Sequence, residues 1–172
     1  WPRLLQLAWQ LHDAKGKLVN RGNYIVRPDG FTIPFNSEKI HGISTNRALK
    51  EGKDLNEVLG LFQEDVDKAL ITIGHNIDFD NKIVGTEFVR CQQENLGHAL
   101  LEKENIDTSL VSKEYCQLQG GVGGKLKSPK LIELHEKLFG VGFEDAHDAA
   151  YDVDATAKCF FGLIKEKVVS PL

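Results

Sequence analysis

The sequence predicts a single α/β domain in which helices flank a mixed β-sheet. Strand-like segments come first and then alternate with helical segments, which is the order typical of this class. With 172 residues, of which 41% are apolar, the chain is long enough for one complete core and too short for two ordinary domains. We find no interdomain linker and no internal repeat in the sequence.

The first third of the chain is predicted to form a β-hairpin. Apolar residues are dense over residues 4–11, residues 13–16 form a break that contains glycine, and an extended run resumes over 18–28. Two extended runs around such a break are a hairpin signal. Extended character continues over 31–35, where Pro34 favours an edge strand or a loop.

Helical patterns follow this extended region. Short helical turns are predicted at 37–42 and after Ser44, and a longer amphipathic helix begins at the capping-box-like pair Asp54 and Glu57. The apolar residues of that helix recur at helical spacing: Leu55, Val58, Leu59, Phe62 and Val66.

Short strands alternate with helices in the second half of the chain. Strands are predicted over 70–74 and 106–107, with a helix over 79–93 between them. A glycine-rich loop at 120–124 precedes a helix predicted over 128–139. The last helix is predicted near residues 147–167, with Val153, Ala157, Phe160 and Ile164 on its buried face.

The composition excludes several classes of partner. The chain has 21 Lys and Arg residues against 25 Asp and Glu residues, a net charge of −4, so it does not grip nucleic acid or an anionic membrane by bulk positive charge. No apolar run approaches the ~20 residues that span a bilayer, and we expect no membrane partner. The three cysteines are an odd number with no CxxC spacing, which indicates small buried side chains in a reducing cytoplasm.

The start of the chain is unusual. The sequence contains no methionine and begins with Trp1, directly before strand-like sequence. No basic and then apolar leader explains this start. We therefore expect that the chain is incomplete at its N-terminus and lacks a strand there.

Two short segments carry the residue types that chemistry needs. His75-Asn76-Ile77-Asp78-Phe79-Asp80 lies where a predicted strand ends and a helix begins, a junction where α/β folds gather ligand-binding groups. His147-Asp148-Ala149-Ala150-Tyr151-Asp152 lies at the start of the last helix, with Asp152 beside the apolar face. Taken singly, each has a structural interpretation. Asp80 and Asp152 could be acids that favour a helix N-terminus, His75 a strand-end histidine with a satisfied ring, and His147 the neighbour of an N-cap.

Together, the two segments resemble a known family. The HNxxFD pattern, the later HxxxxD pattern and the intervening pair Asp107-Thr108 are similar to the DEDD superfamily of 3′–5′ exonucleases, in the branch with histidine in its third motif. Its members include the proofreading epsilon subunit of bacterial DNA polymerase III, ribonuclease T and oligoribonuclease. The resemblance covers essentially the whole chain and implies a ribonuclease H-like fold.

The resemblance implies roles for particular residues. Asp80 and Asp152 would be metal-binding carboxylates, and His147 the general base that activates water. Asn76 and Phe79 would help to shape the nucleotide site. Outside these motif positions, Asp78, Asp145, Asp148 and Asp154 are expected to be solvated acids, and His12, His98 and His135 to be surface residues.

A third segment matches the family more weakly. Ile40-His41-Gly42-Ile43 corresponds to the segment that touches the terminal nucleotide in this family, which makes His41, Gly42 and Ile43 candidate substrate-binding residues. Lys125, Lys127 and Lys130 could add phosphate contacts beside the glycine-rich loop, or could form an ordinary solvated surface.

The first motif of the family, Asp-x-Glu on the first strand, does not precede the hairpin in this sequence. Asp80 and Asp152 cannot by themselves hold two ions ~3.5–4 Å apart. Either the motif lies upstream of Trp1 or this homologue has lost catalysis. A chain that begins in what resembles the second strand of the family favours the first explanation.

The sequence therefore predicts a metal-dependent exonuclease that releases nucleoside monophosphates from DNA 3′ ends, with two divalent ions, Mg²⁺ or Mn²⁺. Its expected partner is a single-stranded nucleic acid 3′ end, and the likeness to the epsilon subunit leaves a DNA polymerase open as a second partner. Two alternatives remain: an RNA exonuclease similar to oligoribonuclease or ribonuclease T, and an inactive exonuclease fold kept as a binding module. An HD-type phosphohydrolase would be all-helical, which the hairpin argues against.

Overall fold

The computed structural model describes residues 1–143 and 148–171. Its strands are β1 (Gln6–His12), β2 (Leu18–Ile25), β3 (Thr72–Gly74) and β4 (Asn105–Asp107). Its helices are α1 (Phe35–His41), α2 (Thr45–Glu51), α3 (Leu55–Val66), α4 (Ile77–Arg90), α5 (Glu94–Glu102), α6 (Thr108–Val111), α7 (Lys113–Cys116), the 3₁₀ turn η1 (Val122–Gly124), α8 (Leu131–Phe139) and α9 (Ala149–Lys165). The predicted α/β class is confirmed.

Within the described residues, the strands form two small sheets. β1 and β2 pair antiparallel from Gln6 opposite Ile25 to His12 opposite Leu18, so the predicted hairpin is present. β3 and β4 pair in parallel, with Gly74 opposite Asp107. The parallel pairing places the carboxyl ends of β3 and β4 at one edge of their sheet.

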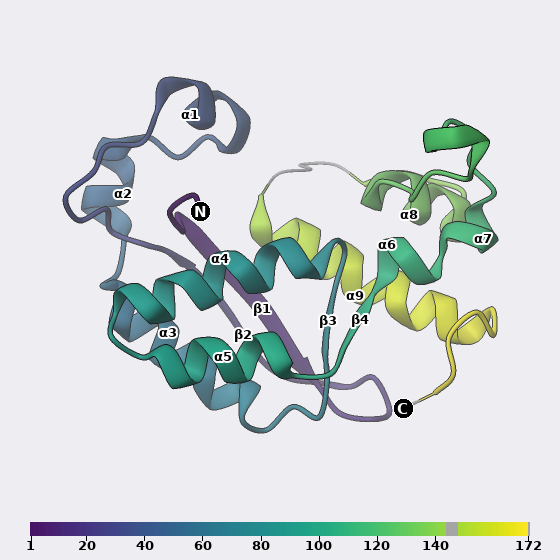
Figure 1. Cartoon of the computed structure of the whole chain (residues 1–172), viewed down its shortest axis with the longest axis horizontal. Coiled ribbons are helices and arrows are strands. Elements are labelled where there is room, and N and C mark those ends of the chain that lie inside the picture. The colour runs from purple at the N-terminus through teal and green to yellow at the C-terminus, as the bar shows by residue number, and fades with distance from the viewer. Residues whose placement is uncertain (144–147, 172) are drawn as a thin grey trace.

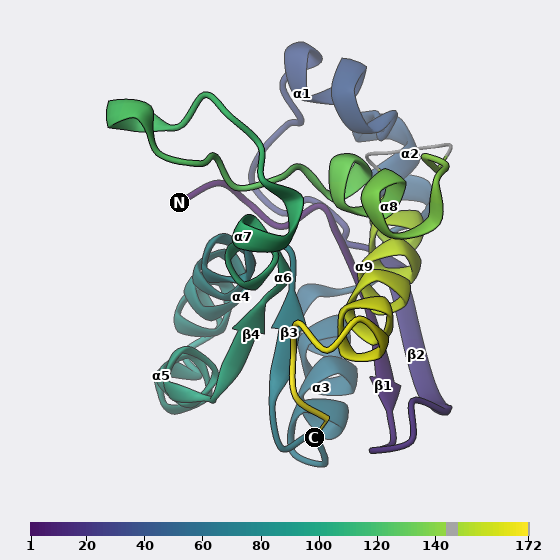
Figure 2. The same ribbon diagram turned by 90° about the vertical axis from the view of Figure 1, so that its right-hand side faces the viewer.

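Helices cover both faces of the hairpin, because its side chains alternate between two directions. Trp9 of β1 packs against Phe62 of α3, whereas His12 packs against Phe161 of α9. α9 also contacts β3, so this one helix spans both sheets, and α4 covers β3 and β4. Figures 1 and 2 show α9 running beside both pairs of strands.

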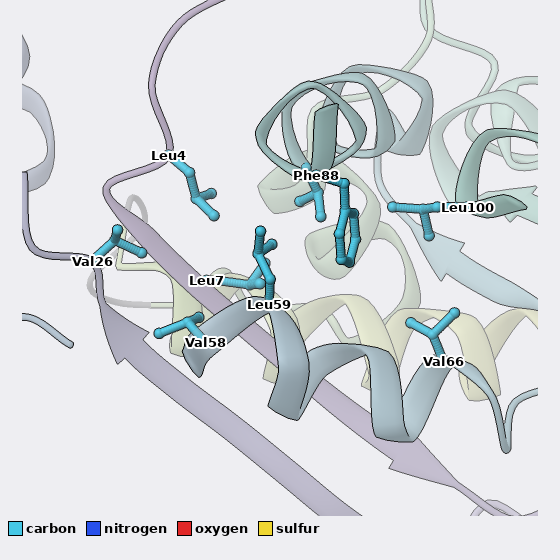
Figure 3. Close-up of a cluster of buried hydrophobic side chains, with 9 residues drawn as sticks. Leu4, Leu7, Val26, Val58, Leu59, Val66, Phe88 and Leu100 are labelled. Carbon is cyan, nitrogen blue, oxygen red and sulfur yellow. The ribbon is translucent and has the colours of Figure 1, made fainter. Parts of the chain in front are cut away.

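The main apolar core lies between the hairpin, α3, α4 and α5 (Figure 3). Its most buried members include Leu59 and Phe88, neither of which is exposed at all. Trp9 adds to this core and donates from Nε1 to the buried Asp65 carboxylate, 2.9 Å away. Asn20 donates to the same Asp65 oxygen over 2.8 Å, which ties the hairpin to α3.

A buried carboxylate fastens the N-terminal segment to α4. The Glu87 side chain is 1% exposed, and its Oε1 accepts hydrogen bonds from Arg3 Nε (3.0 Å), Arg90 Nη1 (3.0 Å) and the backbone N–H of Leu4 (2.9 Å). Arg90 also donates to the carbonyl oxygen of Trp1 over 3.0 Å. Each cation compensates part of the cost of burying the carboxylate.

Candidate active site

The site forms where β3 and β4 end. Asn76, the N-cap of α4, has a left-handed backbone with φ of 68°. Its N–H donates to Oδ1 of Asp107 over 3.0 Å, and the same oxygen accepts from the N–H (2.9 Å) and the hydroxyl (2.7 Å) of Ser109. The carboxylate of Asp107 therefore stabilises the turn after β3, through Asn76, and the turn after β4, through Ser109. The first of these bonds fixes the direction in which α4 leaves the sheet.

Asp80 lies in the first turn of α4 and interacts electrostatically with two further carboxylates. Its side chain reaches solvent, but surrounding protein atoms remove part of its hydration. This loss of hydration and then the negative charges of Asp107 and Asp152 raise the pKa of Asp80 to about 6. Asp80 and Asp152, the two predicted metal-binding residues, are thus close enough to influence each other.

Asp152 reaches this edge from α9. It is half-buried in the first turn of that helix, and its N–H donates to the carbonyl oxygen of Asp148 over 3.0 Å. Asp148, which was expected to be a solvated acid, caps α9 through a 2.9 Å bond from the N–H of Ala150. His147, the predicted general base, and Asp145 lie outside the described residues.

The donors present at this edge are chemically suited to a hard divalent cation. Carboxylate oxygens are the ligands that Mg²⁺ and Mn²⁺ prefer, and a bound cation would offset both the lost hydration of Asp80 and its repulsion by Asp107 and Asp152. Within residues 1–143 and 148–171, however, no group of three or more His, Cys, Asp or Glu side chains has an arrangement that could hold a metal. A divalent ion bound at this edge would therefore need ligands besides Asp80 and Asp152.

The predicted nucleotide-binding segment ends α1. Gly42 has a left-handed φ of 69°, which favours glycine, and Nδ1 of His41 accepts from the N–H of Ile43 over 3.1 Å. Burial lowers the pKa of His41, and its Nε2 is covered without a hydrogen-bond partner among the described residues. Ile43 is only 3% exposed and packs with Ile33 and Ala48.

The helix that ends with His41 lies apart from the helices that carry the carboxylates. Figures 1 and 2 show α1 at the top of the molecule and the starts of α4 and α9 below it. Phe79, the neighbour of Asp80 in α4, is 43% exposed. Its ring packs against that of Trp1 in a T-shaped arrangement, with 6.2 Å between the ring centroids.

A cavity of about 550 Å³ adjoins this edge. Its walls come from three segments: the turn after β3 with His75 and Asn76, the start of α6 with Asp107 and Ser109, and residues 128–130. Lys130 lines the cavity, whereas Lys127 pairs with Glu133 at 2.7 Å and so has a structural partner. The volume lies in the range of ligand pockets.

The sequence does not predict the hydrogen bonds of Asp107, although a carboxylate directly after a short strand is a signal for such a role. For His75 the structure supports the interpretation as a strand-end histidine with a satisfied ring, because both nitrogens have partners within the protein.

Comparison with known proteins agrees with the fold, which is that of the DEDD superfamily of exonucleases. Residues 9–160 match the RNase_T exonuclease model, and the chain belongs to this exonuclease family. The resemblance found in the sequence is confirmed.

The curated relatives are larger proteins. The PolC-type DNA polymerase III of Streptococcus thermophilus is 27% identical over 152 residues, which cover 88% of this chain and 9% of the relative. The Staphylococcus aureus protein of the same description is 28% identical over 152 residues, covering 86% of this chain and 10% of the relative. The chain thus spans about a tenth of the length of these relatives.

Solved structures of Escherichia coli Exonuclease I share the fold. The complex with a 5cy-dT13 oligonucleotide has a TM-score of 0.74 at 18% identity and covers 95% of this chain and 37% of that one. The complex with a dA16 oligonucleotide has a TM-score of 0.73 at 18% identity and covers 96% and 38%. In the part of the chain that the structure describes, no helix combines the length and apolar character needed to cross a membrane.

Proposed function

We propose that this protein removes nucleotides from the 3′ end of single-stranded DNA by metal-dependent hydrolysis and releases nucleoside monophosphates. The observation that carries the proposal is the approach of Asp80, Asp107 and Asp152 at the edge where β3 and β4 end; loss of hydration and then the charges of the other two carboxylates raise the pKa of Asp80 there. Such a cluster is unfavourable without a cation and favourable with one. The relatives named as DNA polymerases and the Exonuclease I complex with a DNA oligonucleotide support DNA as the substrate.

We assign metal binding, proton transfer and nucleotide binding to different residues. Asp80 and Asp152 would hold divalent metal, Mg²⁺ or Mn²⁺, which when bound lowers the pKa of water and stabilises charge on the phosphate. We assign to His147 the acceptance of the proton from the attacking water. His41, Gly42, Ile43, Asn76 and Phe79 are the proposed contacts to the terminal nucleotide.

Two metal ions and a polymerase partner complete the proposal. Two ions need more oxygen ligands than Asp80 and Asp152 provide, so water, the substrate and further protein oxygens would supply the rest. The PolC-type relatives support a setting beside a DNA polymerase, in which the domain would remove mismatched 3′ ends.

The test compares two nucleic acids under controlled metal. The protein, as it is made in the cell, is incubated with 5′-labelled DNA and RNA strands of the same sequence, with Mg²⁺, with Mn²⁺ and with EDTA. We expect shortening from the 3′ end of DNA that EDTA abolishes. Faster degradation of the RNA strand would instead support the oligoribonuclease-like alternative, and binding without shortening would support the inactive module.

Variants then test the assignment of the carboxylates. Asp80→Asn and Asp152→Asn each replace a metal-binding charge with a neutral amide, so turnover should fall by orders of magnitude while the fold is kept. Asp67→Asn is the matched control, because Asp67 is an exposed acid at the end of α3. Full activity in Asp152→Asn would refute this site.

A further inference from the structure

His75 stands between β3 and α4, and both nitrogens of its imidazole are engaged by the protein. Nδ1 lies 2.9 Å from the hydroxyl oxygen of Thr108, and Nε2 lies 2.9 Å from the carbonyl oxygen of Pro129. Because a carbonyl only accepts, Nε2 is a protonated donor. A ring held in this way does not take a proton from substrate or water, so His75 is not the general base.

One end of this contact joins the two parallel strands. Thr108 is fully buried directly after β4, and its hydroxyl also lies 3.1 Å from the carbonyl oxygen of Gly74, the last residue of β3. Burial lowers the pKa of His75, although its bond to Pro129 and the charges of Asp107 and Asp152 act in the opposite direction. The one hydrogen of the Thr108 hydroxyl is donated to the Gly74 carbonyl, so toward Nδ1 of His75 the Thr108 oxygen can only accept.

The other end of the contact reaches α8. Pro129 is buried and directly precedes Lys130, the N-cap of α8. The hydrogen bonds of α8 begin with the carbonyl of Lys130, which accepts from the N–H of Leu134 at 3.0 Å. The carbonyl of Pro129 lies outside this ladder and accepts from His75 instead.

The segment that His75 holds is otherwise free of regular structure over much of its length. Gly120, Gly123 and Gly124 all have positive φ, a backbone state that glycine reaches without strain and that leaves the chain conformationally permissive. Figure 2 shows this segment, between α7 and α8, extending away from the sheets. The bond to Pro129 is thus the point where the segment returns to the site.

α8 in turn packs against α9, the helix that carries Asp152. Leu134 of α8 packs with Cys159 and Leu163 of α9, and all three side chains are fully buried. α9 holds Asp152 in its first turn. Contacts therefore run from the end of β3 through His75 and α8 to the helix that carries Asp152.

We propose that His75 is a positioning residue, which holds residues 128–130 against the ends of β3 and β4 and so builds the cavity wall that guides a nucleic-acid strand to Asp80 and Asp152. The kinetic part of this inference rests on the exonuclease function proposed above. The structural part depends only on the contacts of the chain itself.

Two substitutions separate the hydrogen bonds from the bulk of the ring. His75→Phe keeps an aromatic ring but removes both bonds, whereas His75→Gln has an amide N–H that can still donate to the Pro129 carbonyl. In His75→Phe we expect hydrogen exchange of the amides in 125–130 to become about tenfold faster, and KM for single-stranded DNA to rise about tenfold with kcat nearly unchanged. Tenfold corresponds to ~1.4 kcal/mol, in the range for one hydrogen bond. His75→Gln should restore most of both quantities.

Controls make the outcome decisive. His98→Phe changes an exposed histidine of α5 and should behave as wild type, and Thr108→Val removes one partner of His75 and should add little to His75→Phe. The p-nitrophenyl ester of thymidine 5′-monophosphate has no strand to guide, so His75→Phe should hydrolyse it normally.

Unchanged hydrogen exchange and KM in His75→Phe would overturn the proposal. An equal loss of activity with both substrates that His75→Gln fails to rescue would also overturn it. If the wild type degrades no nucleic acid, the proposed function fails, and the exchange measurement still decides the role of His75.

Discussion

The N–H of Asn76 donates to Oδ1 of Asp107 over 3.0 Å and thereby links the turns that follow the two parallel strands. Asn76 has a φ of 68°, a left-handed conformation that costs roughly 1 kcal/mol in a residue other than glycine. The hydrogen bond offsets this strain, and it fixes the first turn of α4, where Asp80 lies. The position of Asp80 at the edge where β3 and β4 end therefore depends on Asp107.

Replacing Asp107 should separate its geometric role from its charge. Asp107→Ala removes the acceptor of three hydrogen bonds, and we expect the free energy of unfolding to fall by about 1–3 kcal/mol, with a large loss of exonuclease activity. Asp107→Asn keeps an oxygen at the position of Oδ1 and should lose less stability. Urea unfolding and a single-strand degradation assay measure both effects. Equal losses in the two variants would show that the charge, not the hydrogen bonding, is what matters.

The spacing of apolar residues predicted much of the fold, because spacing reports which face of a segment is buried. The hairpin and α3 lie where the patterns place them. In α9 the prediction was wrong in detail: Val153, Ala157 and Ile164 are only half-buried, and Phe160 is buried as expected. The fully covered positions also include Ala155, Cys159 and Leu163. α9 contacts β1, β3 and α8, so residues on more than one face of this helix are buried. The spacing of apolar residues alone does not show which face is buried most completely.

Contacts between distant turns were not predictable from the pattern. The role of Asp107 depends on the parallel register that sets Gly74 opposite it, which no local pattern contains. His135 was expected at the surface, yet it is 8% exposed, with Nδ1 2.7 Å from the carbonyl oxygen of Val141. Its ring packs 4.7 Å from that of Phe139, between centroids. Tertiary packing, not local preference, decides such positions.

The raised pKa of Asp80 means that ionisation of this carboxyl lowers the free energy of unfolding. Its value of about 6 in the folded protein exceeds the ordinary 3.8, so between these values the folded state binds a proton that the unfolded state lacks. This carboxyl therefore lowers the free energy of unfolding as pH rises from about 4 to 6, and the loss is complete at higher pH. Asp80→Asn should raise Tm at pH 7.5. Because the side chain reaches solvent, which screens the repulsion, the gain should be about 2–4 °C.

Divalent metal provides the control for this prediction. Mg²⁺ binds the ionised carboxylate, so it should raise the Tm of the wild type at pH 7.5 and have less effect at pH 5, where Asp80 is protonated. Asp80→Asn should lose this response and Asp67→Asn should keep it. Calorimetry across pH, with and without Mg²⁺, gives the measurement. A metal response that persists in Asp80→Asn would place the ion elsewhere.

Glu87 should be among the most sensitive positions for stability. Glu87→Ala leaves the N–H of Leu4 and the side chains of Arg3 and Arg90 without their shared acceptor, and we expect a loss of about 3 kcal/mol. Glu87→Gln keeps one oxygen but loses the charge and should give a smaller loss. The exposed Glu64 of α3 offers the matched control, since Glu64→Gln should change the free energy of unfolding by less than about 0.5 kcal/mol. A loss in Glu87→Ala no larger than that of the control would contradict this account.

His147 should govern the pH dependence of turnover. An imidazole with an ordinary pKa of ~6.5 accepts a proton from water at neutral pH, so His147→Ala should lower kcat by about 10²- to 10⁴-fold. Asp80, with its pKa of about 6, titrates in the same range and would obscure the result at low metal concentration. Saturating Mg²⁺ keeps Asp80 ionised, and under that condition the acid limb of the kcat–pH profile should report His147 and vanish in the variant. Oligonucleotide affinity and the Mg²⁺-dependent rise in Tm should be unchanged, because a base that only moves a proton holds neither ligand. A variant that loses the Mg²⁺ response but keeps its pH profile would show instead that His147 binds metal and that another group takes the proton.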